Sequence, residues 1–308
     1  EVRNRIFVPA HTTNYGENNL PSSRHLAYHK ARAAGGAGLI IFEGIRVHKS
    51  SLGRQQGVNG YEAASIPKFS EIAKAVQGEG SRLFGQILHL GRHIDGNFAR
   101  MASWSASSIP WTATAPAPHP MTENEIKLVI GAHADVAANL LEAGLDGIEL
   151  QLAHGHLLQQ FLSPIANERG DKYGGNLENR MRIVMETAIA VRQMIGADRT
   201  MGVRISADEF LQGGLTLNDM CTVVLKLASA VQLDFVNVSH SAYHGSYTIS
   251  TQIADMAFSN QQFRYLTEAI STNLDGLERK PVIMSVCRYN SVELAEDMLA
   301  TEKADMIG

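Results

Sequence analysis

The chain has 308 residues, of which 44% are hydrophobic and 19% are charged, and 27 Lys plus Arg against 31 Asp plus Glu give a formal net charge of −4. This composition predicts a folded chain with a large core, and the lack of a basic stripe argues against nucleic acid as a partner. No signal-like start and no run of about 18 uncharged apolar residues occurs, so we expect no membrane partner. Cys221 and Cys287 lie far apart in apolar surroundings, which favours reduced thiols and a cytoplasmic location.

Short apolar segments alternate with longer segments of helical spacing along the whole chain. The predicted strands span residues 6–9, 38–43, 83–88, 147–152, 201–205, 235–239, 282–285 and 305–307. The predicted helices span residues 22–35, 66–78, 122–143, 177–195, 216–230, 260–274 and 291–300. Strands that alternate with helices of these lengths indicate parallel βαβ units, and eight strands favour a closed α/β (β/α)8 TIM barrel over an open doubly wound sheet.

The chain stops at the predicted eighth strand. A TIM barrel needs a further helix to cover that strand, so we expect the last helix and any C-terminal domains to lie beyond residue 308. The first residue is Glu1 rather than Met, and a strand follows almost at once. We therefore expect the natural protein to begin earlier as well.

The connection over residues 91–120 is long and rich in Ser, Ala and Pro. Connections of this length inside a compact domain are usually functional or disordered. Because it follows the third strand, it is expected at the catalytic face of a barrel. It predicts either a lid that carries Trp104 and Trp111 or a packed surface loop.

Polar residues concentrate where the predicted strands end. Of the twelve histidines, eight fall in these stretches: His11, His48, His89, His93, His154, His156, His240 and His244. A single histidine is more often a satisfied hydrogen-bonding group than a functional one. Reactive groups of TIM barrels lie at the C-terminal ends of the strands, so the joint placement of these histidines indicates a site on that rim.

Gln86 and Arg204 lie inside strands whose other residues are apolar, in "FGQIL" and "GVRIS". A charged Arg inside a barrel needs an electron-rich partner. A flavin provides one, since its N1/O2 edge gains negative charge on reduction, and a Gln offers both a donor and an acceptor to the pyrimidine edge. The alternative is an ion pair between Arg204 and Glu149 or Glu43.

A metal site is the interpretation of another class. In "HGH", His154 and His156 are one residue apart, as in metal-dependent barrel hydrolases. Such a site also needs carboxylates at other strand ends, and only Asp208 and Glu209 are evident. We therefore predict no metal, and a metal-dependent TIM-barrel hydrolase stays as the alternative.

The stretch after the fourth strand, "AHGHLLQQFLSPIANERGDKYGGNLENRMR" (153–182), resembles the old yellow enzyme family of NADH:flavin oxidoreductases. Further matching stretches follow in the same order as in the family: "NRIFVPAHTT" (4–13), "GLIIFEGI" (38–45), "GQILHLGR" (85–92), "GVRIS" (202–206) and the terminal "ADMIG". Within the family the chain is most similar to the branch of trimethylamine dehydrogenase, 2,4-dienoyl-CoA reductase and N-methylproline demethylase-like proteins.

The resemblance implies that residues 1–308 form a single FMN-binding TIM barrel, part of a longer chain, that acts on a small-molecule substrate. It implies non-covalent FMN contacts from Ala10, His11, Thr12 and Gly44, from Gln86 at the pyrimidine edge, from Arg204 at N1/O2, and from Cys287 and Arg288 near the phosphate. NAD(P)H is a candidate reductant. A 4Fe–4S centre is expected only beyond residue 308, and a homo-oligomer is compatible with the family.

The chain departs from the ene-reductase members at the fourth strand. Those members have a His, then a His or Asn, then a Tyr that protonates the substrate; here Gln151, His154 and His156 stand at these positions. His and Tyr differ in ordinary pKa, about 6.5 against about 10. We therefore predict oxidative N-demethylation of a small N-methylated amine or amino acid, with these three residues and His244 at the reacting end. NAD(P)H-dependent reduction of an activated C=C bond is the alternative.

Overall fold

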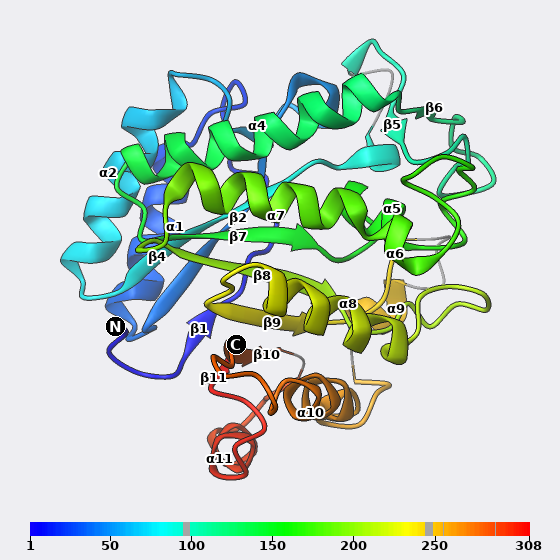
Figure 1. The fold of residues 1–308 in the computed structure, drawn as a ribbon. Coiled ribbons are helices and arrows are strands. Elements are labelled where there is room, and N and C mark those ends of the chain that lie inside the picture. Colours follow the sequence, from blue (N-terminus) through cyan, green and yellow to red (C-terminus); the bar gives the residue numbers. More distant parts are fainter. Residues whose placement is uncertain (95–98, 244–248, 255, 287) are drawn as a thin grey trace.

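Eight parallel strands form a nearly closed barrel in the computed structural model, which describes residues 1–94, 99–243, 249–254, 256–286 and 288–308 (Figure 1). The strands follow the chain in order: β1 (Phe7–Val8), β2 (Leu39–Arg46), β4 (Arg82–Leu88), β7 (Gly147–Leu152), β8 (Thr200–Ser206), β9 (Phe235–Ser239), β10 (Val282–Ser285) and β11 (Met306–Ile307). A parallel bridge between Ile6 and Ile307 brings the last strand beside the first. The predicted TIM barrel is confirmed.

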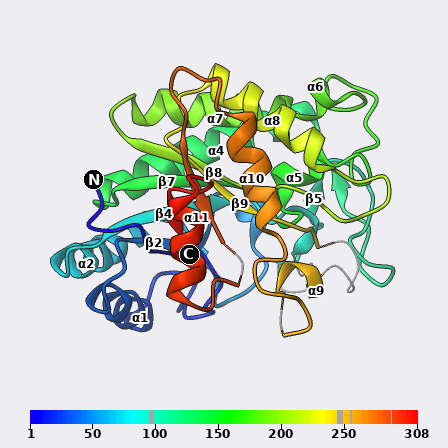
Figure 2. The same cartoon turned by 90° about the horizontal axis from the view of Figure 1, so that it is seen from below.

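Helices follow the strands and cover the outside of the barrel, as predicted. The main ones are α1 (Ser23–Ala34), α2 (Ser65–Gly78), α4 (Glu123–Glu142), α7 (Arg182–Ile195), α8 (Leu217–Ala230), α10 (Arg264–Asn273) and α11 (Val292–Ala300). Shorter elements are β3 (Val58–Asn59), β5 (Trp104–Ser105), β6 (His119–Pro120), α5 (Leu157–Leu162), α6 (Leu177–Arg180) and α9 (Ile249–Gln252). The predicted helix at 177–195 is thus divided into α6 and α7. Seen from below, α10 lies beside α8 (Figure 2).

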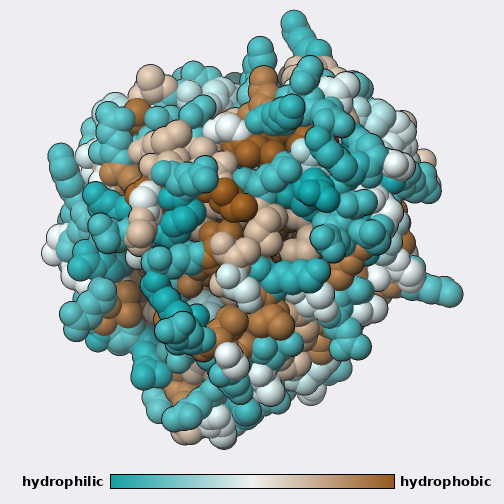
Figure 3. Space-filling view, in the orientation of Figure 1, coloured by the Kyte–Doolittle hydropathy of each residue, from teal (hydrophilic) through white to brown (hydrophobic). Residues whose placement is uncertain are grey.

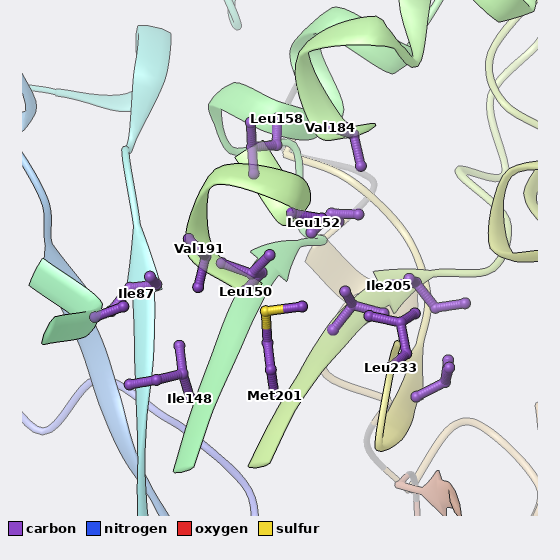
Figure 4. Packing of buried hydrophobic residues seen from close by; sticks show 14 of the residues in the cluster. Ile87, Ile148, Leu150, Leu152, Leu158, Val184, Val191, Met201, Ile205 and Leu233 are labelled. Carbon is purple, nitrogen blue, oxygen red and sulfur yellow. The ribbon is translucent and has the colours of Figure 1, made fainter. Parts of the chain in front are cut away.

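Side chains along each strand point alternately to the outside of the barrel and to its interior. In β7, Ile148, Leu150 and Leu152 are fully buried in the main hydrophobic core, on the side of α7 (Figure 4). The intervening Glu149 and Gln151 point to the opposite face, because successive side chains of a strand alternate. The helix-packed core therefore fixes which polar side chains enter the barrel.

A hydrophobic cluster fills the barrel below these polar side chains. It consists of Phe7, Ala10, Leu39, Ile41, Phe84, Phe235, Met284 and Met306. Two glycines make room for its rings: a Cβ on Gly202 would lie 2.4 Å from the Phe235 ring, and one on Gly147 would lie 2.8 Å from the Phe84 ring. The lower barrel is therefore a packed core, and the polar groups are confined to its upper part.

The connection over residues 91–120 packs against the loop after β2. The Trp104 ring lies 5.6 Å from the His48 ring and 6.3 Å from the His89 ring, centroid to centroid. Ser105, the next residue, is fully buried, and its hydroxyl donates a hydrogen bond to Gln160 Oε1 of α5. The described part of this connection is therefore a packed loop around Trp104, whereas Trp111 lines the cavity described below.

The outer surface carries mostly polar residues on the face shown in Figure 3, with smaller hydrophobic areas between them. None of the helices in the described residues combines the length and the apolar character that crossing a bilayer requires.

A buried histidine on α1 makes the stability of the barrel sensitive to acid. His29 is 2% exposed, and neither ring nitrogen has a hydrogen-bond partner. It packs on Phe42 of β2, with ring centroids 4.9 Å apart. Burial lowers the pKa of His29 to about 3, so the unfolded chain takes up this proton first as the pH falls. The stabilisation from a neutral His29 is complete above the ordinary pKa of histidine. It is lost as the pH falls from there toward the pKa of His29 in the folded protein.

We compare the free energy of unfolding of His29→Leu with that of the natural chain. We expect this difference to favour the variant by about 2 kcal/mol more at pH 5 than at pH 8. Any change in packing shifts both values equally, so the difference between them isolates the titration. Urea unfolding at the two pH values measures it. A substitution effect that is the same at both pH values would show that His29 does not carry the acid sensitivity.

Candidate active site

The C-terminal ends of the strands open into a cavity of about 810 Å³. Ten of the predicted site residues line it: Ala10, His11, Thr12, Gly44, Gln86, Gln151, His154, His156, Arg204 and Arg288. The other two, His244 and Cys287, lie outside the described residues. Cavities of this size hold ligands the size of a cofactor. The structure therefore brings the described predicted residues together, while their individual roles stay predictions.

Arg204 of β8 reaches the floor of the cavity and is 8% exposed. Its Nη1 donates to the carbonyl oxygen of Ala10 (2.9 Å), and its buried Nε has no partner. Among the described residues no carboxylate lies within 4.0 Å of Arg204, so the alternative of a direct ion pair with Glu149 or Glu43 is not formed. Burial lowers the pKa of Arg204, and the charge of Glu149 opposes this from a greater distance.

Glu149 of β7 anchors a buried amide network beneath the cavity. Its carboxylate accepts from Gln86 Nε2 (2.7 Å) and from Asn237 Nδ2 (2.8 Å), and the residue is fully buried. Gln151 Nε2 then donates to Gln86 Oε1 (3.3 Å). Glu149 therefore fixes the orientation of the Gln86 amide, which keeps one N–H and one lone pair available.

The backbone of His154 adopts the left-handed region, with φ of 60°, which turns its ring back toward β9. Gln151 Nε2 lies 3.4 Å from Nδ1, and the Ser239 hydroxyl lies 2.9 Å from Nε2. Because an amide nitrogen only donates, Nδ1 accepts and Nε2 carries the proton. Burial, assisted by the Arg204 charge, lowers the pKa of His154 well below its ordinary value, so the ring is neutral at pH 7 with both nitrogens engaged.

His156 belongs to an aromatic cluster on one wall of the cavity. Its Nδ1 lies 3.3 Å from Nδ1 of His93, and His93 Nε2 donates to the Tyr243 carbonyl oxygen (3.1 Å). The ring centroids of Trp111 and Tyr243 each lie 5.5 Å from that of His93. Burial lowers the pKa of His156 to about 4. The His156 ring is therefore neutral at pH 7 and carries no imidazolium proton to donate.

Several cavity residues were not among the predicted site residues. They are Glu43, Arg46, Gly53, Arg54, Gly57, Leu88, Leu90, His93, Trp111, Ser239, His240, Tyr243, Gln252, Ile253, Ala254 and Val286. His93 and His240 were among the histidines that indicated a site on the rim, although no individual role was predicted for them. Tyr243 also follows a predicted strand, and this position was the signal that could have found it. Arg54 lies well past the end of β2, and no local pattern in the sequence indicates that it reaches the cavity.

The cavity fits FMN by the donors that it presents. The unpartnered Nε of Arg204 is a buried cationic donor that needs an acceptor, and Arg288 lines the same cavity from the end of β10. By contrast, the described residues contain no group of three or more His, Cys, Asp or Glu side chains arranged to hold a metal. Glu209, one of the carboxylates considered for a metal, is buried and accepts from Gln159 and Ser163.

The model of the NADH:flavin oxidoreductase / NADH oxidase family matches residues 1–308. The chain belongs to this family. The predicted resemblance is therefore confirmed.

Individual relatives agree with the family. The chain is 33% identical to NADH oxidase of Thermoanaerobacter brockii over 99% of this chain and 46% of that protein. It is 34% identical to N,N-dimethylglycine/sarcosine dehydrogenase of Chromohalobacter salexigens over 87% of this chain and 39% of that protein. A solved structure of 2-naphthoyl-CoA reductase with 2-naphthoyl-CoA shares the fold, with a TM-score of 0.92 at 24% identity over 99% of this chain and 47% of that one. The chain thus spans less than half the length of these three proteins.

Proposed function

We propose that this barrel catalyses the oxidative N-demethylation of a small N-methylated amine or amino acid with FMN in the cavity. The observation that carries the proposal is the chemistry of the side chains at the end of β7. Gln151 is an amide, and burial lowers the pKa values of His154 and His156, so all three are uncharged at pH 7. The similarity to N,N-dimethylglycine/sarcosine dehydrogenase supports the same substrate class.

Amine oxidation needs a free lone pair on nitrogen, whereas alkylamines are mostly ammonium ions at pH 7. The burial and the Arg204 charge that keep His154 neutral act in the same direction on a bound ammonium and favour the neutral amine. The proton that the ammonium releases passes to water, because an imidazole whose pKa is lowered to about 4 is too weak a base to keep it. The Gln151 amide, held by Gln86, positions the amine from the side of β7.

Bound FMN would accept the hydride that leaves the N-methyl carbon. The substrate becomes an iminium ion, which water hydrolyses to formaldehyde and the demethylated amine. The residues of the chain bind and orient the amine and keep it neutral. Arg204 carries a fixed positive charge on the cavity floor, where it favours the electron-rich form of the cofactor.

A second reaction is supported by Tyr243, which brings a phenol to the cavity from the end of β9. Its ring centroid lies 6.3 Å from that of His156. A phenol at this place could protonate an alkene carbon, the task of the Tyr that the end of β7 lacks. NAD(P)H-dependent reduction of an activated C=C bond therefore stays as the alternative.

Anaerobic mixing separates the two reactions. We expect N-methylproline or sarcosine to bleach the flavin absorbance without NAD(P)H and to yield one formaldehyde per flavin reduced. The alternative would be established by a different result. In that case no amine bleaches the flavin, NADH or NADPH alone does, and cyclohexenone then reoxidises it. Tyr243→Phe sharpens the comparison, because it removes the phenol and should leave amine bleaching in place.

A further inference from the structure

Arg54 stands apart from the other arginines of the cavity because its donors are uncommitted. It is exposed and lines the cavity from the loop between β2 and α2. Its one side-chain hydrogen bond among the described residues runs from Nη1 to Asn14 Oδ1, at 3.3 Å. No carboxylate of the described residues forms an ion pair with it. A guanidinium has five N–H donors, so Arg54 retains most of them for a ligand.

The other three arginines of the cavity are already engaged. Arg46 is 3% exposed and donates to Asn19 Oδ1 and to the Arg54 carbonyl oxygen, both at 2.9 Å. Arg204 donates to Ala10 on the cavity floor. Arg288 donates from Nη1 to the Phe258 carbonyl oxygen (2.7 Å) and is the residue predicted near the cofactor phosphate. Arg54 is thus the cation of this cavity that neither the fold nor the predicted flavin contacts account for.

The backbone of Arg54 is held in place although its side chain is exposed. Its carbonyl oxygen accepts from Arg46 Nη1 and from Gly57 N. Gln56 on the same loop accepts from Gly16 N (2.9 Å), which ties this loop to the one after β1. A Cβ on Gly57 would lie 2.6 Å from the Arg46 guanidinium, so a larger residue here would push this guanidinium aside. The loop that presents Arg54 is therefore a built part of the cavity rim.

We propose that Arg54 binds the carboxylate of the substrate and makes the site selective for N-methyl amino acids over N-methyl amines. This inference rests on the proposed demethylation. Arg54 lines the same cavity as His156, which belongs to the wall where the amine would react. An Arg fork matches a carboxylate in two parallel hydrogen bonds. Asn14, already bonded to Arg54, offers an amide beside the same position.

The test compares matched substrates that differ only in the carboxylate. Sarcosine without its carboxylate is dimethylamine, and N-methylproline without it is N-methylpyrrolidine. In Arg54→Met we expect the amine concentration for half-maximal flavin bleaching to rise about 10- to 100-fold for the two amino acids, and by less than twofold for the two amines. Lys49→Met removes a neighbouring positive charge outside the cavity and should change neither, while Arg54→Lys should be intermediate.

A binding measurement makes the test independent of turnover. N-methylpyrrole-2-carboxylate should perturb the flavin absorbance of the natural chain, and Arg54→Met should weaken this binding by the same factor; N-methylpyrrole serves as the carboxylate-free control. An equal loss for acids and amines overturns the proposal, and so does a selective loss of NADH and NADPH binding, which would assign Arg54 to the nucleotide phosphates. If no amine bleaches the flavin yet the carboxylate probe still depends on Arg54, the demethylation fails and the anion subsite stands.

Discussion

Arg204→Met is expected to weaken FMN binding about 30- to 100-fold, because a buried charge-assisted hydrogen bond is worth about 2–3 kcal/mol. The guanidinium is the cationic donor on the cavity floor, its Nε has no partner in the protein, and its Nη1 holds the Ala10 carbonyl oxygen of the loop after β1. The flavin content after dialysis and a fluorescence titration of the apoprotein with FMN measure the loss. Unaltered FMN affinity would contradict the placement of the flavin over Arg204.

A second variant keeps this prediction testable if Arg204→Met fails to fold. Removing Arg204 leaves the Glu149 carboxylate buried with no cation near it, and an uncompensated buried charge is strongly destabilising. Burial already raises the pKa of Glu149, and Arg204 is the charge that opposes this rise. The double variant Glu149→Gln, Arg204→Met removes both charges and should fold while still binding FMN more weakly than the natural chain. Arg199→Met serves as the control, since Arg199 is exposed just before β8, at the other end of the barrel.

The double substitution Gln151→His, His156→Tyr is expected to shift the chemistry from amine oxidation toward C=C reduction. A Tyr at position 156 adds an O–H donor that stays protonated at pH 7, and a His at position 151 adds a second ring donor for a carbonyl oxygen. A positioned general acid contributes about 10²- to 10⁴-fold, so we expect NADPH-dependent cyclohexenone reduction to rise at least about 100-fold. Bleaching by N-methyl amino acids should fall about tenfold or more, since a phenol replaces the uncharged imidazole on the wall where the amine would react.

The double variant Gln151→His, His156→Phe is the matched control for this exchange. It has the same ring size at position 156 without the hydroxyl, so it should lose amine bleaching and gain no enone reduction. If both double variants reduce cyclohexenone equally well, the hydroxyl at this position is not the proton donor. Tyr243, whose ring neighbours that of His156, would then be the next group to replace.

The sequence by itself determined the barrel and the rim on which the cavity lies. The apolar period of Ile148, Leu150 and Leu152 marks one face of β7, and strand alternation then places Glu149 and Gln151 inside. The same rule applied to "GVRIS" puts Arg204 in the barrel. These inferences are reliable because alternation and the C-terminal position of reactive groups are local properties of a parallel strand.

Only the tertiary structure decided how the polar groups are engaged. His154 and His156 are neighbours in sequence, yet one turns back to Ser239 of β9 and the other joins His93 and Tyr243. Arg54 enters the cavity because the Arg46 guanidinium holds its loop. Such contacts join segments far apart in the chain, and a side chain finds its partner only after the strands have closed into a barrel. The sequence therefore supplied the candidates, and the closed barrel decided which of them keep a free donor or lone pair.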